Sequence, residues 1–181
     1  MNNCDMKKLL MLMVLFVMGV SQMMNAQAVS ESKLYGKWLL TNKDGSTMTL
    51  DFATDGEYGM VTIMQPTKYV ERGIGAHYKM YVYMPVYWSL NGSQLEVVFD
   101  THSYDSDIKV VKYVGVTKSQ AENEYAYDFE QLERGLLNDF ETQVTYDPNP
   151  VYVFKVISVT PTTLVVKARG AKVNTTLKRV K

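Results

Sequence analysis

Four residues near the middle of the chain form its densest group of potential metal ligands and acid–base residues. Asp100, His102, Asp105 and Asp107 follow one another closely. Their spacing matches neither a calcium loop nor a zinc site, and short acids between strands commonly form turns. We therefore expect no metal at this cluster.

No recognisable catalytic motif accompanies the two histidines of the chain, His77 and His102. The sequence has no Gly-x-Ser-x-Gly elbow that would pair a nucleophilic serine with either of them. The glycine-rich run 72–76 lacks the lysine and the helix start of a phosphate-binding loop. We therefore expect no enzyme, no catalytic residue and no cofactor.

The first 28 residues have the layout of an export signal. Lys7 and Lys8 precede an apolar run at 9–20, which is too short to cross a bilayer core about 30 Å thick. An Ala-Gln-Ala sequence predicts cleavage after Ala28. The alternative is a retained N-terminal anchor, against which the polar residues after the run argue. We expect a periplasmic or extracellular protein with no membrane span after signal removal.

The single cysteine of the chain lies within this signal. Cys4 precedes the apolar run, whereas a lipoprotein needs a cysteine just after it, so lipidation is not expected. Cleavage would leave residues 29–181 without cysteine, which excludes disulfides, thiol catalysis and cysteine-bound metals. The remaining length is that of one domain.

Charge is balanced over the whole chain but unevenly distributed. The chain has 19 basic and 19 acidic residues and therefore lacks the excess of basic residues that would indicate a nucleic-acid partner. Residues 119–143 carry seven acids against Arg134 alone, whereas residues 155–181 carry seven basic residues and no acid. We expect the acidic segment to lie beside the basic one; the alternative is a basic patch for an anionic partner.

Alternation of apolar and polar residues from Leu34 onward predicts short strands. Turn signals such as Asp44-Gly45, Asp55-Gly56 and Asn91-Gly92 separate them. Pro85 is expected to introduce a bend or bulge. The predicted strands are 36–41, 46–53, 58–65, 76–84, 86–90, 94–100, 108–116, 151–158, 163–169 and 173–180.

A helical period replaces the alternation at about 119–143. One apolar stripe is formed by Ala121, Tyr125, Phe129, Leu132, Leu136 and Phe140. Ser119 and Glu122 have the spacing of a capping box that would start the helix. We therefore predict a mainly β fold, an antiparallel barrel of about 8–10 short strands with one amphipathic α-helix inserted before the last three strands. The strands are too short for an outer-membrane barrel.

Several segments resemble the lipocalins and the wider calycin group. Gly36-Lys37-Trp38 resembles their first-strand Gly-x-Trp motif, and segments 87–97, 156–166 and 176–181 resemble hairpins and the last strand of small secreted lipocalin-like proteins of Bacteroidetes. The resemblance implies that Gly36 and Trp38 close the barrel, with Arg179 crossing the tryptophan ring. It also implies that a small molecule binds inside.

Strand parity suggests which residues face the interior. In the tyrosine-rich segment 78–84, Lys79, Tyr81 and Tyr83 alternate with the more apolar residues and so lie on the opposite face of the strand. The predicted interior, ligand-binding residues are Met48, Leu50, Phe52, Met80, Val82 and Met84, with a loop at 66–76 at one mouth. A core filled by side chains is the alternative to a cavity.

Two functions follow from these expectations. The first is a secreted or periplasmic, non-enzymatic protein that binds a small apolar or amphipathic ligand inside the barrel. The second is an interaction module that binds a protein or polysaccharide through an exposed tyrosine-rich face or the basic C-terminal strands. A cavity would favour the first, and a filled barrel with an external aromatic patch the second. The sequence predicts no oligomeric state.

Overall fold

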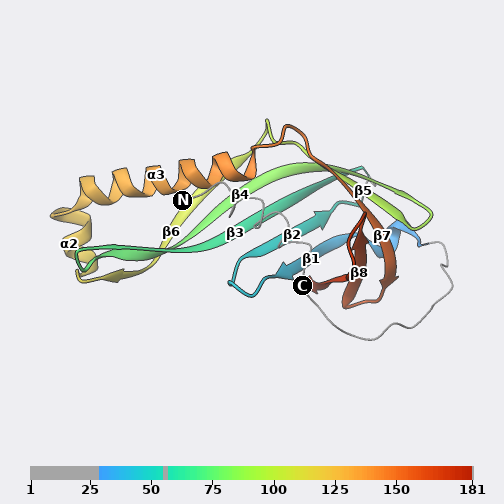
Figure 1. Ribbon diagram of the computed structural model, residues 1–181, viewed down its shortest axis with the longest axis horizontal. Coiled ribbons are helices and arrows are strands. Elements are labelled where there is room, and N and C mark those ends of the chain that lie inside the picture. Colours follow the sequence, from blue (N-terminus) through green and yellow to red (C-terminus); the bar gives the residue numbers. More distant parts are fainter. Residues whose placement is uncertain (1–28, 55–56, 181) are drawn as a thin grey trace.

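A computed structural model describes residues 29–54 and 57–180 of the chain. Figure 1 shows a barrel from which a long hairpin and a helix extend. The strands are β1 (Gly36–Thr41), β2 (Thr47–Phe52), β3 (Tyr58–Glu71), β4 (Ile74–Asn91), β5 (Gln94–Phe99), β6 (Asp105–Val114), β7 (Val151–Val159), β8 (Thr163–Ala168) and β9 (Thr175–Val180). The helices are the short 3-10 helix η1 (Glu31–Lys33), α2 (Lys118–Asn123) and α3 (Ala126–Val144).

Eight of the strands close into an antiparallel barrel. They follow one another in the order β3-β2-β1-β9-β8-β7-β5-β4, and pairing of β4 with β3 completes the ring. Burial alternates along the wall as a pleated strand requires: in β2, Met48, Leu50 and Phe52 are buried and the residues between them are half-buried. The predicted barrel, with helical structure before the last three strands, is confirmed.

One continuous cluster of buried side chains forms the barrel core. It includes aromatic rings in contact: Phe52 meets Trp88 edge-on at a centroid distance of 5.0 Å, and Phe99 meets Tyr152 at 4.9 Å. Phe140 belongs to the same cluster although it lies on α3. The helix therefore contributes directly to the core of the barrel.

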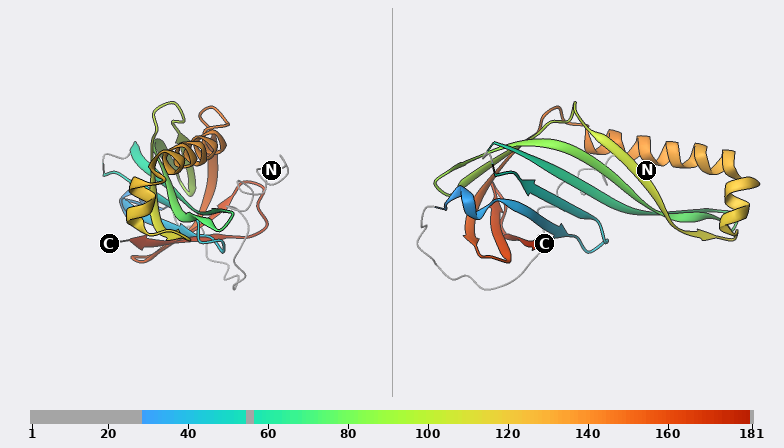
Figure 2. Two further views of the ribbon diagram at one scale, coloured as in Figure 1. Left: turned by 90° about the vertical axis from the view of Figure 1, so that its left-hand side faces the viewer. Right: turned by 180° about the vertical axis from the view of Figure 1, so that it is seen from behind.

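Strands β3 and β4 continue past the barrel wall. Beyond Met64, β3 has no partner in β2, and β4 residues 75–83 pair with β6 instead of β5. β5 and β6 thus follow each other along the same edge of β4. We call this part the arm: residues 65–71 of β3, the 74–80 segment of β4 that pairs with them, all of β6, and the two α-helices. Both views of Figure 2 show α3 along one face of the arm strands.

A second buried cluster holds the helices against the arm. It contains Ala76 and Tyr78 from β4, Ala121 from α2 and Phe129 from α3. Tyr113 of β6 meets Phe129 edge-on at 5.4 Å. The side of β4 that faces the barrel interior thus becomes, farther along, the side that the helices cover.

Two predictions about β3 and β4 are wrong. The segment 66–76 is not a loop at a barrel mouth but the end of the long hairpin, with a tight turn in which Arg72 and Gly73 have φ values of 48° and 84°. Pro85 does not interrupt β4. Its carbonyl oxygen accepts a hydrogen bond from Asp100 N–H at 3.0 Å, so the edge on which it has no N–H faces the end of β5, where few ladder bonds are needed.

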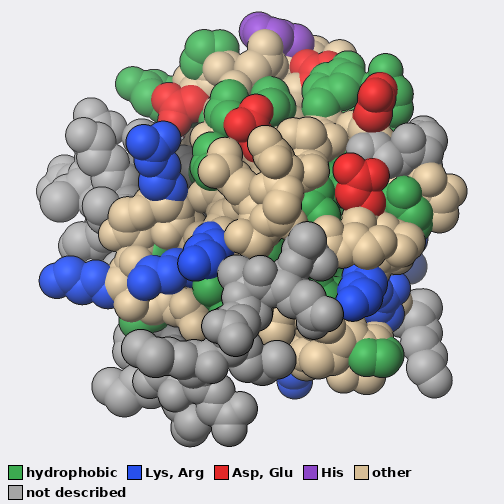
Figure 3. All heavy atoms as spheres, turned by 90° about the vertical axis from the view of Figure 1, so that its right-hand side faces the viewer, with side chains coloured by type: hydrophobic (Ala, Val, Ile, Leu, Met, Phe, Trp, Pro, Cys, Tyr) green, Lys and Arg blue, Asp and Glu red, His purple; other side chains and the backbone are tan. Residues whose placement is uncertain are grey.

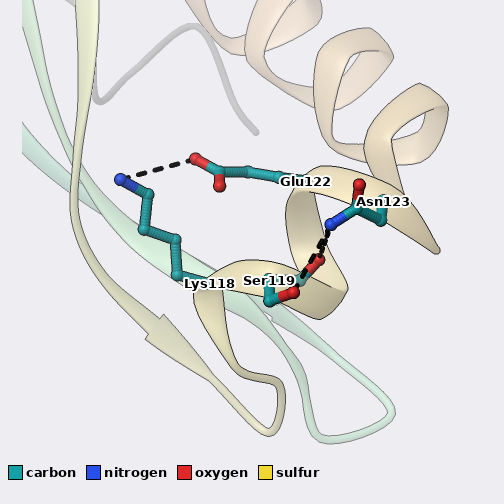
Figure 4. Close-up of polar contacts among 4 residues, drawn as sticks. All are labelled: Lys118, Ser119, Glu122 and Asn123. Atoms are coloured by element: carbon teal, nitrogen blue, oxygen red, sulfur yellow. Dashed lines mark hydrogen bonds and ion pairs between the residues drawn. The ribbon is translucent and has the colours of Figure 1, made fainter.

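Two helices replace the single predicted helix. Thr117 caps α2: its hydroxyl accepts from Gln120 N–H at 3.2 Å, and the Gln120 side chain accepts from Thr117 N–H at 3.1 Å. The predicted capping box of Ser119 and Glu122 is therefore wrong. Both residues lie inside α2, where Glu122 forms an ion pair of 3.5 Å with Lys118 (Figure 4).

The acidic helix does not lie along the basic C-terminal strands. α3 packs on β4 and β6, whereas β8 and β9 belong to the barrel wall (Figure 1). The ion pair of Glu130 with Arg134, at 2.8 Å, lies within the helix itself. Figure 3 views the barrel end and shows basic side chains gathered on one half of that face and acidic ones on the other. The acidic segment and the basic segment therefore have different packing neighbours, and within the described residues no ion pair joins them.

The predicted export segment, residues 1–28, and the predicted turn at residues 55–56 lie outside the described residues. Cleavage after Ala28 and export thus stay predictions. Within residues 29–54 and 57–180, no helix is both long enough and apolar enough to cross a bilayer.

Candidate binding surface

The six predicted interior residues all lie in the barrel core cluster. Their side chains are Met48, Leu50, Phe52, Met80, Val82 and Met84, none more than 8% exposed. They pack against large rings, including Trp88 and Phe140, so side chains occupy the space that an internal ligand would need. Ligand binding at these residues stays a prediction.

The three predicted barrel-closing residues meet at the start of β1. The Arg179 guanidinium lies over the Trp38 ring, 4.2 Å from its centroid, and donates to the carbonyl oxygens of Tyr35 at 2.7 Å and Lys33 at 2.9 Å. Gly36 has a φ of 101°, and an added Cβ would lie 3.1 Å from Arg179 Nη1. The arrangement fixes the chain entering β1 and has a structural role.

A pair of tyrosines stands on the outer face of β4. Tyr81 and Tyr83 are half-buried and their rings are nearly parallel, with an interplanar angle of 6° and a centroid distance of 6.1 Å. Met64 and Thr62 lie opposite them on β3. Both rings are therefore partly accessible to solvent, and each combines an apolar ring with a phenolic hydroxyl.

Two further tyrosines extend this surface along the same strands. Tyr58 and Tyr87 are paired across β3 and β4, are 51% and 44% exposed, and meet at a centroid distance of 5.3 Å. Between the two pairs lie Met60 and Pro85, also directly opposite each other. We call Tyr58, Tyr81, Tyr83 and Tyr87 the tyrosine face.

Carboxylates border the tyrosine face on β6. Asp107 lies opposite Tyr81, and Asp105 lies opposite Tyr83. Lys109 forms an ion pair with Asp107 at 3.1 Å and lies over the Tyr81 ring, 5.2 Å from its centroid. The hydrogen bond and charge of Asp107 raise the pKa of Lys109, so this lysine is a stable cation at neutral pH.

An open groove continues the same outer face toward the tip of the arm. Its volume is about 300 Å³. The residues that line it include Asp44, Pro66, Lys68, His77, Lys79 and Val111. Asp44 comes from the β1–β2 turn, where its Oδ1 accepts from Ser46 N–H at 2.9 Å and from the Ser46 hydroxyl at 2.6 Å. We call this the basic groove, because lysines and a histidine dominate its polar lining.

The aspartate and histidine cluster does not assemble into a metal site. Asp100 accepts a hydrogen bond from His102 N–H at 3.1 Å, and this bond is the main reason that the pKa of the Asp100 carboxyl is lowered. Asp105 and Asp107 instead lie on β6 beside the tyrosines. Across the described part of the chain, no group of three or more potential ligands could hold a metal ion.

Beneath the arm lies a buried hydroxyl without a partner. Tyr78 is 1% exposed, and its hydroxyl has no hydrogen-bond partner among the described residues. Burial, and secondarily the charge of Glu133, raises the pKa of Tyr78, so the phenol stays neutral. Its ring faces the helices, so this hydroxyl does not belong to the outer surface.

The sequence predicted the tyrosines but not the basic groove. Alternation in the sequence places Lys79 on the tyrosine side of β4, but it predicts a loop around Lys68 and assigns Lys112 to no face. A bulge in β6, where that strand pairs with His77 and Tyr78 of β4, interrupts the two-residue alternation of β6. The regular part of that period, from Lys79 through Tyr83, was the signal that could have led to the groove.

Neither protein-family models, nor curated proteins, nor solved structures match this chain. The closed eight-stranded antiparallel barrel is consistent with a lipocalin-like fold and compatible with a binding role. Which ligand is bound must therefore be argued from the surface just described.

Proposed function

We propose that the protein is a non-enzymatic binding module whose tyrosine face binds a polysaccharide. The observation that carries the proposal is the parallel Tyr81–Tyr83 ring pair, displayed outward on a barrel whose interior is occupied by side chains. Because side chains occupy the interior, the outward rings are the surface on which we expect recognition.

The chemistry of the face suits sugars. The C–H faces of sugar rings pack on aromatic rings, and a tyrosine hydroxyl can both donate and accept a hydrogen bond. The carboxylates of Asp105 and Asp107 can accept hydrogen bonds from sugar hydroxyls beside the rings. The surface is set on paired strands, so little conformational freedom is lost on binding.

A polysaccharide fits this face better than a protein partner does. The buried centre of a protein interface is depleted of charged residues. Here Asp105, Asp107 and Lys109 stand within the same surface as Tyr81 and Tyr83. Such close mixing of charges and rings favours a hydroxylated ligand that stays partly hydrated. Export by the predicted signal would bring the protein to the periplasm or the cell exterior, where polysaccharides are abundant.

Calorimetric titration of the purified protein with a panel of oligosaccharides tests this function. Binding by at least one member is expected, and Tyr81→Ala and Tyr83→Ala should each weaken it by about tenfold. Tyr127→Ala is the matched control, because Tyr127 is 72% exposed on α3, away from the face. Equal loss in the control variant, or no binding by any oligosaccharide, would overturn the proposal.

The internal small-molecule ligand implied by the lipocalin resemblance stays a separate prediction. It requires side chains such as Met80 and Met84, both at most 4% exposed, to move aside. Native mass spectrometry of protein isolated from its own producing cells tests it directly. A bound mass that is released on unfolding would support the internal site, and its absence would contradict it.

A further inference from the structure

We infer that the ligand of this surface is an anionic polysaccharide, whose acidic groups lie in the basic groove while its sugar rings contact the adjacent tyrosines. This inference rests on the proposed function and adds the substrate class. It depends on the position of the groove, its charge and the charges beside the tyrosines.

The basic groove and the tyrosine face are parts of one continuous strand surface. Outward residues of β4 run from Tyr83 through Tyr81 and Lys79 to His77. Successive outward residues of a strand lie about 6.8 Å apart, so these four positions span about 20 Å. An extended oligosaccharide lying along β4 would therefore contact both parts.

Neighbouring strands add cations at the groove end of this line. Lys109 lies opposite Lys79 on β6, and Lys68 on β3 and Lys112 on β6 lie opposite His77 from its two sides. The three strands thus place four lysines around one histidine. Parallel alignment of these side chains on one face provides several contacts for a chain that carries repeated negative charges.

Most of these cations lack a carboxylate partner. Within the described residues, Lys68, Lys79 and Lys112 form no ion pair, while Lys109 pairs with Asp107. Asp44 is the acid among the groove lining, and Ser46 already occupies its Oδ1. The acids of α3 lie behind the strands, on the face that the helix covers. An anion in the groove therefore meets a net positive surface.

The tyrosine end of the line argues against a nucleic acid. A polynucleotide carries a phosphate at every unit, so its backbone would bring negative charge close to Asp105 and Asp107. A polysaccharide can present neutral hydroxyls at these carboxylates and place its acidic substituents at the lysines. The carboxylates at the tyrosine end and the cations at the groove end of one face therefore favour the polysaccharide.

The test compares acidic and neutral sugars of equal length on the intact protein. The probes are a hyaluronan oligosaccharide, with a carboxylate at every second sugar, a κ-carrageenan oligosaccharide, with a sulfate at every second sugar, and a neutral malto-oligosaccharide, each titrated at low and physiological salt. The acidic probes should bind at least about tenfold tighter than the neutral one, with an affinity that falls as salt rises. The two acidic probes distinguish a carboxylate ligand from a sulfate ligand.

A charge-matched pair of variants locates the effect. Lys68→Gln with Lys79→Gln should weaken binding of the acidic probes by about tenfold and leave the neutral probe unchanged. Lys155→Gln with Lys167→Gln removes the same charge from two paired positions on β7 and β8 and should leave both affinities unchanged. Thermal melting checks that each variant is folded.

The outcomes separate this inference from the proposed function. Equal affinity for acidic and neutral probes, or equal loss in both double variants, overturns the inference and leaves polysaccharide binding in place. Failure of every sugar overturns both. Tighter binding of an oligothymidylate than of either acidic sugar also overturns the inference, because the ligand class would then be a nucleic acid.

Discussion

Arg179 shows how one side chain can secure the end of a barrel. Its guanidinium covers Trp38 and donates to two carbonyl groups of the segment that precedes β1. Trp38 in turn donates from Nε1 to the Leu34 carbonyl oxygen at 2.5 Å. The C-terminal strand therefore holds the entry of the N-terminal strand, and the two ends of the described chain stabilise each other.

Replacing this arginine by an apolar side chain of similar length should weaken the fold. Arg179→Met loses the hydrogen bonds to Lys33 and Tyr35 and the cation over Trp38, so we expect a loss of about 2 kcal/mol in the free energy of unfolding. Lys178→Met, at the exposed neighbouring position, should stay within about 0.5 kcal/mol of the wild type. Urea denaturation measures both, and equal losses would contradict the role given to Arg179.

For Tyr78, in contrast to Arg179, we expect that a substitution stabilises the fold. Its buried hydroxyl has no partner, so Tyr78→Phe removes a desolvated polar group and should raise the free energy of unfolding by about 1 kcal/mol. Tyr146→Phe serves as the control, because Tyr146 is 70% exposed and should show no change. A decrease in stability for Tyr78→Phe would show that its hydroxyl is hydrogen-bonded in solution.

At the scale of elements, the acidic helix creates a pH dependence. Glu133 on α3 is half-buried against the arm, and burial raises the pKa of its carboxyl above the ordinary value. The folded state therefore holds this proton more tightly than the unfolded state. The contribution of protonated Glu133 to the free energy of unfolding is fully present below the unfolded-state pKa of its carboxyl. It is lost as the pH rises through the folded-state pKa.

Glu133→Gln should remove this dependence. The variant is expected to match the wild type near pH 4 and to become more stable by about 0.5 kcal/mol near pH 7, a modest gain because water screens a half-exposed group. Asp139→Asn, at an exposed position of the same helix, should show no such trend. Chemical denaturation at several pH values measures the difference. A constant offset across the pH range would count against the burial explanation.

The strands show how far the sequence could lead. The first and last residues of β1, β5 and β8 can be predicted closely from alternation and turn residues, because local chemistry decides where these strands begin and end. The continuity of β3 and β4 through Pro66 and Pro85 could not be seen, because it depends on which edge of each strand has a partner. At Pro85, the strand edge that lacks an N–H faces the end of β5. At Pro66, the edge that lacks an N–H lies past Met64, the last β3 residue that pairs with β2, so no neighbouring strand needs that donor.

The same limit explains the candidate site. Strand parity alone placed Lys79 beside Tyr81 and Tyr83. Bringing Lys68 and Lys112 to His77 required the register of three strands and a bulge in one of them. Long-range pairing is decided by the whole fold, so a basic cluster drawn from strands far apart in the sequence remained hidden.

At the scale of the molecule, α3 joins two hydrophobic cores. Phe140 belongs to the barrel cluster, Phe129 to the arm cluster, and Leu136 packs against both. Glu141, near the end of the same helix, accepts hydrogen bonds from the hydroxyls of Ser106 and Tyr104. The helix is therefore the main connection between the helical layer of the arm and the barrel.

Two side-chain truncations on this helix should destabilise different parts of the molecule. Phe140→Ala should cost about 3–5 kcal/mol and increase amide hydrogen exchange in the barrel strands as well as in the arm. Phe129→Ala should raise exchange chiefly in α2, α3 and β6. Hydrogen exchange followed by mass spectrometry maps both variants. The same exchange pattern in both would show that the molecule unfolds as a single unit.

The arm also leaves two strand edges without neighbours, although the barrel itself has none. Open edges can recruit strands from other copies of a protein and start aggregation. Here, one edge carries Pro66, which offers no N–H, and the other carries the bulge that leaves Val111 unpaired. Neither edge presents an uninterrupted row of donors and acceptors. The projecting arm can thus keep its outer face accessible without acting as a template for fibrils.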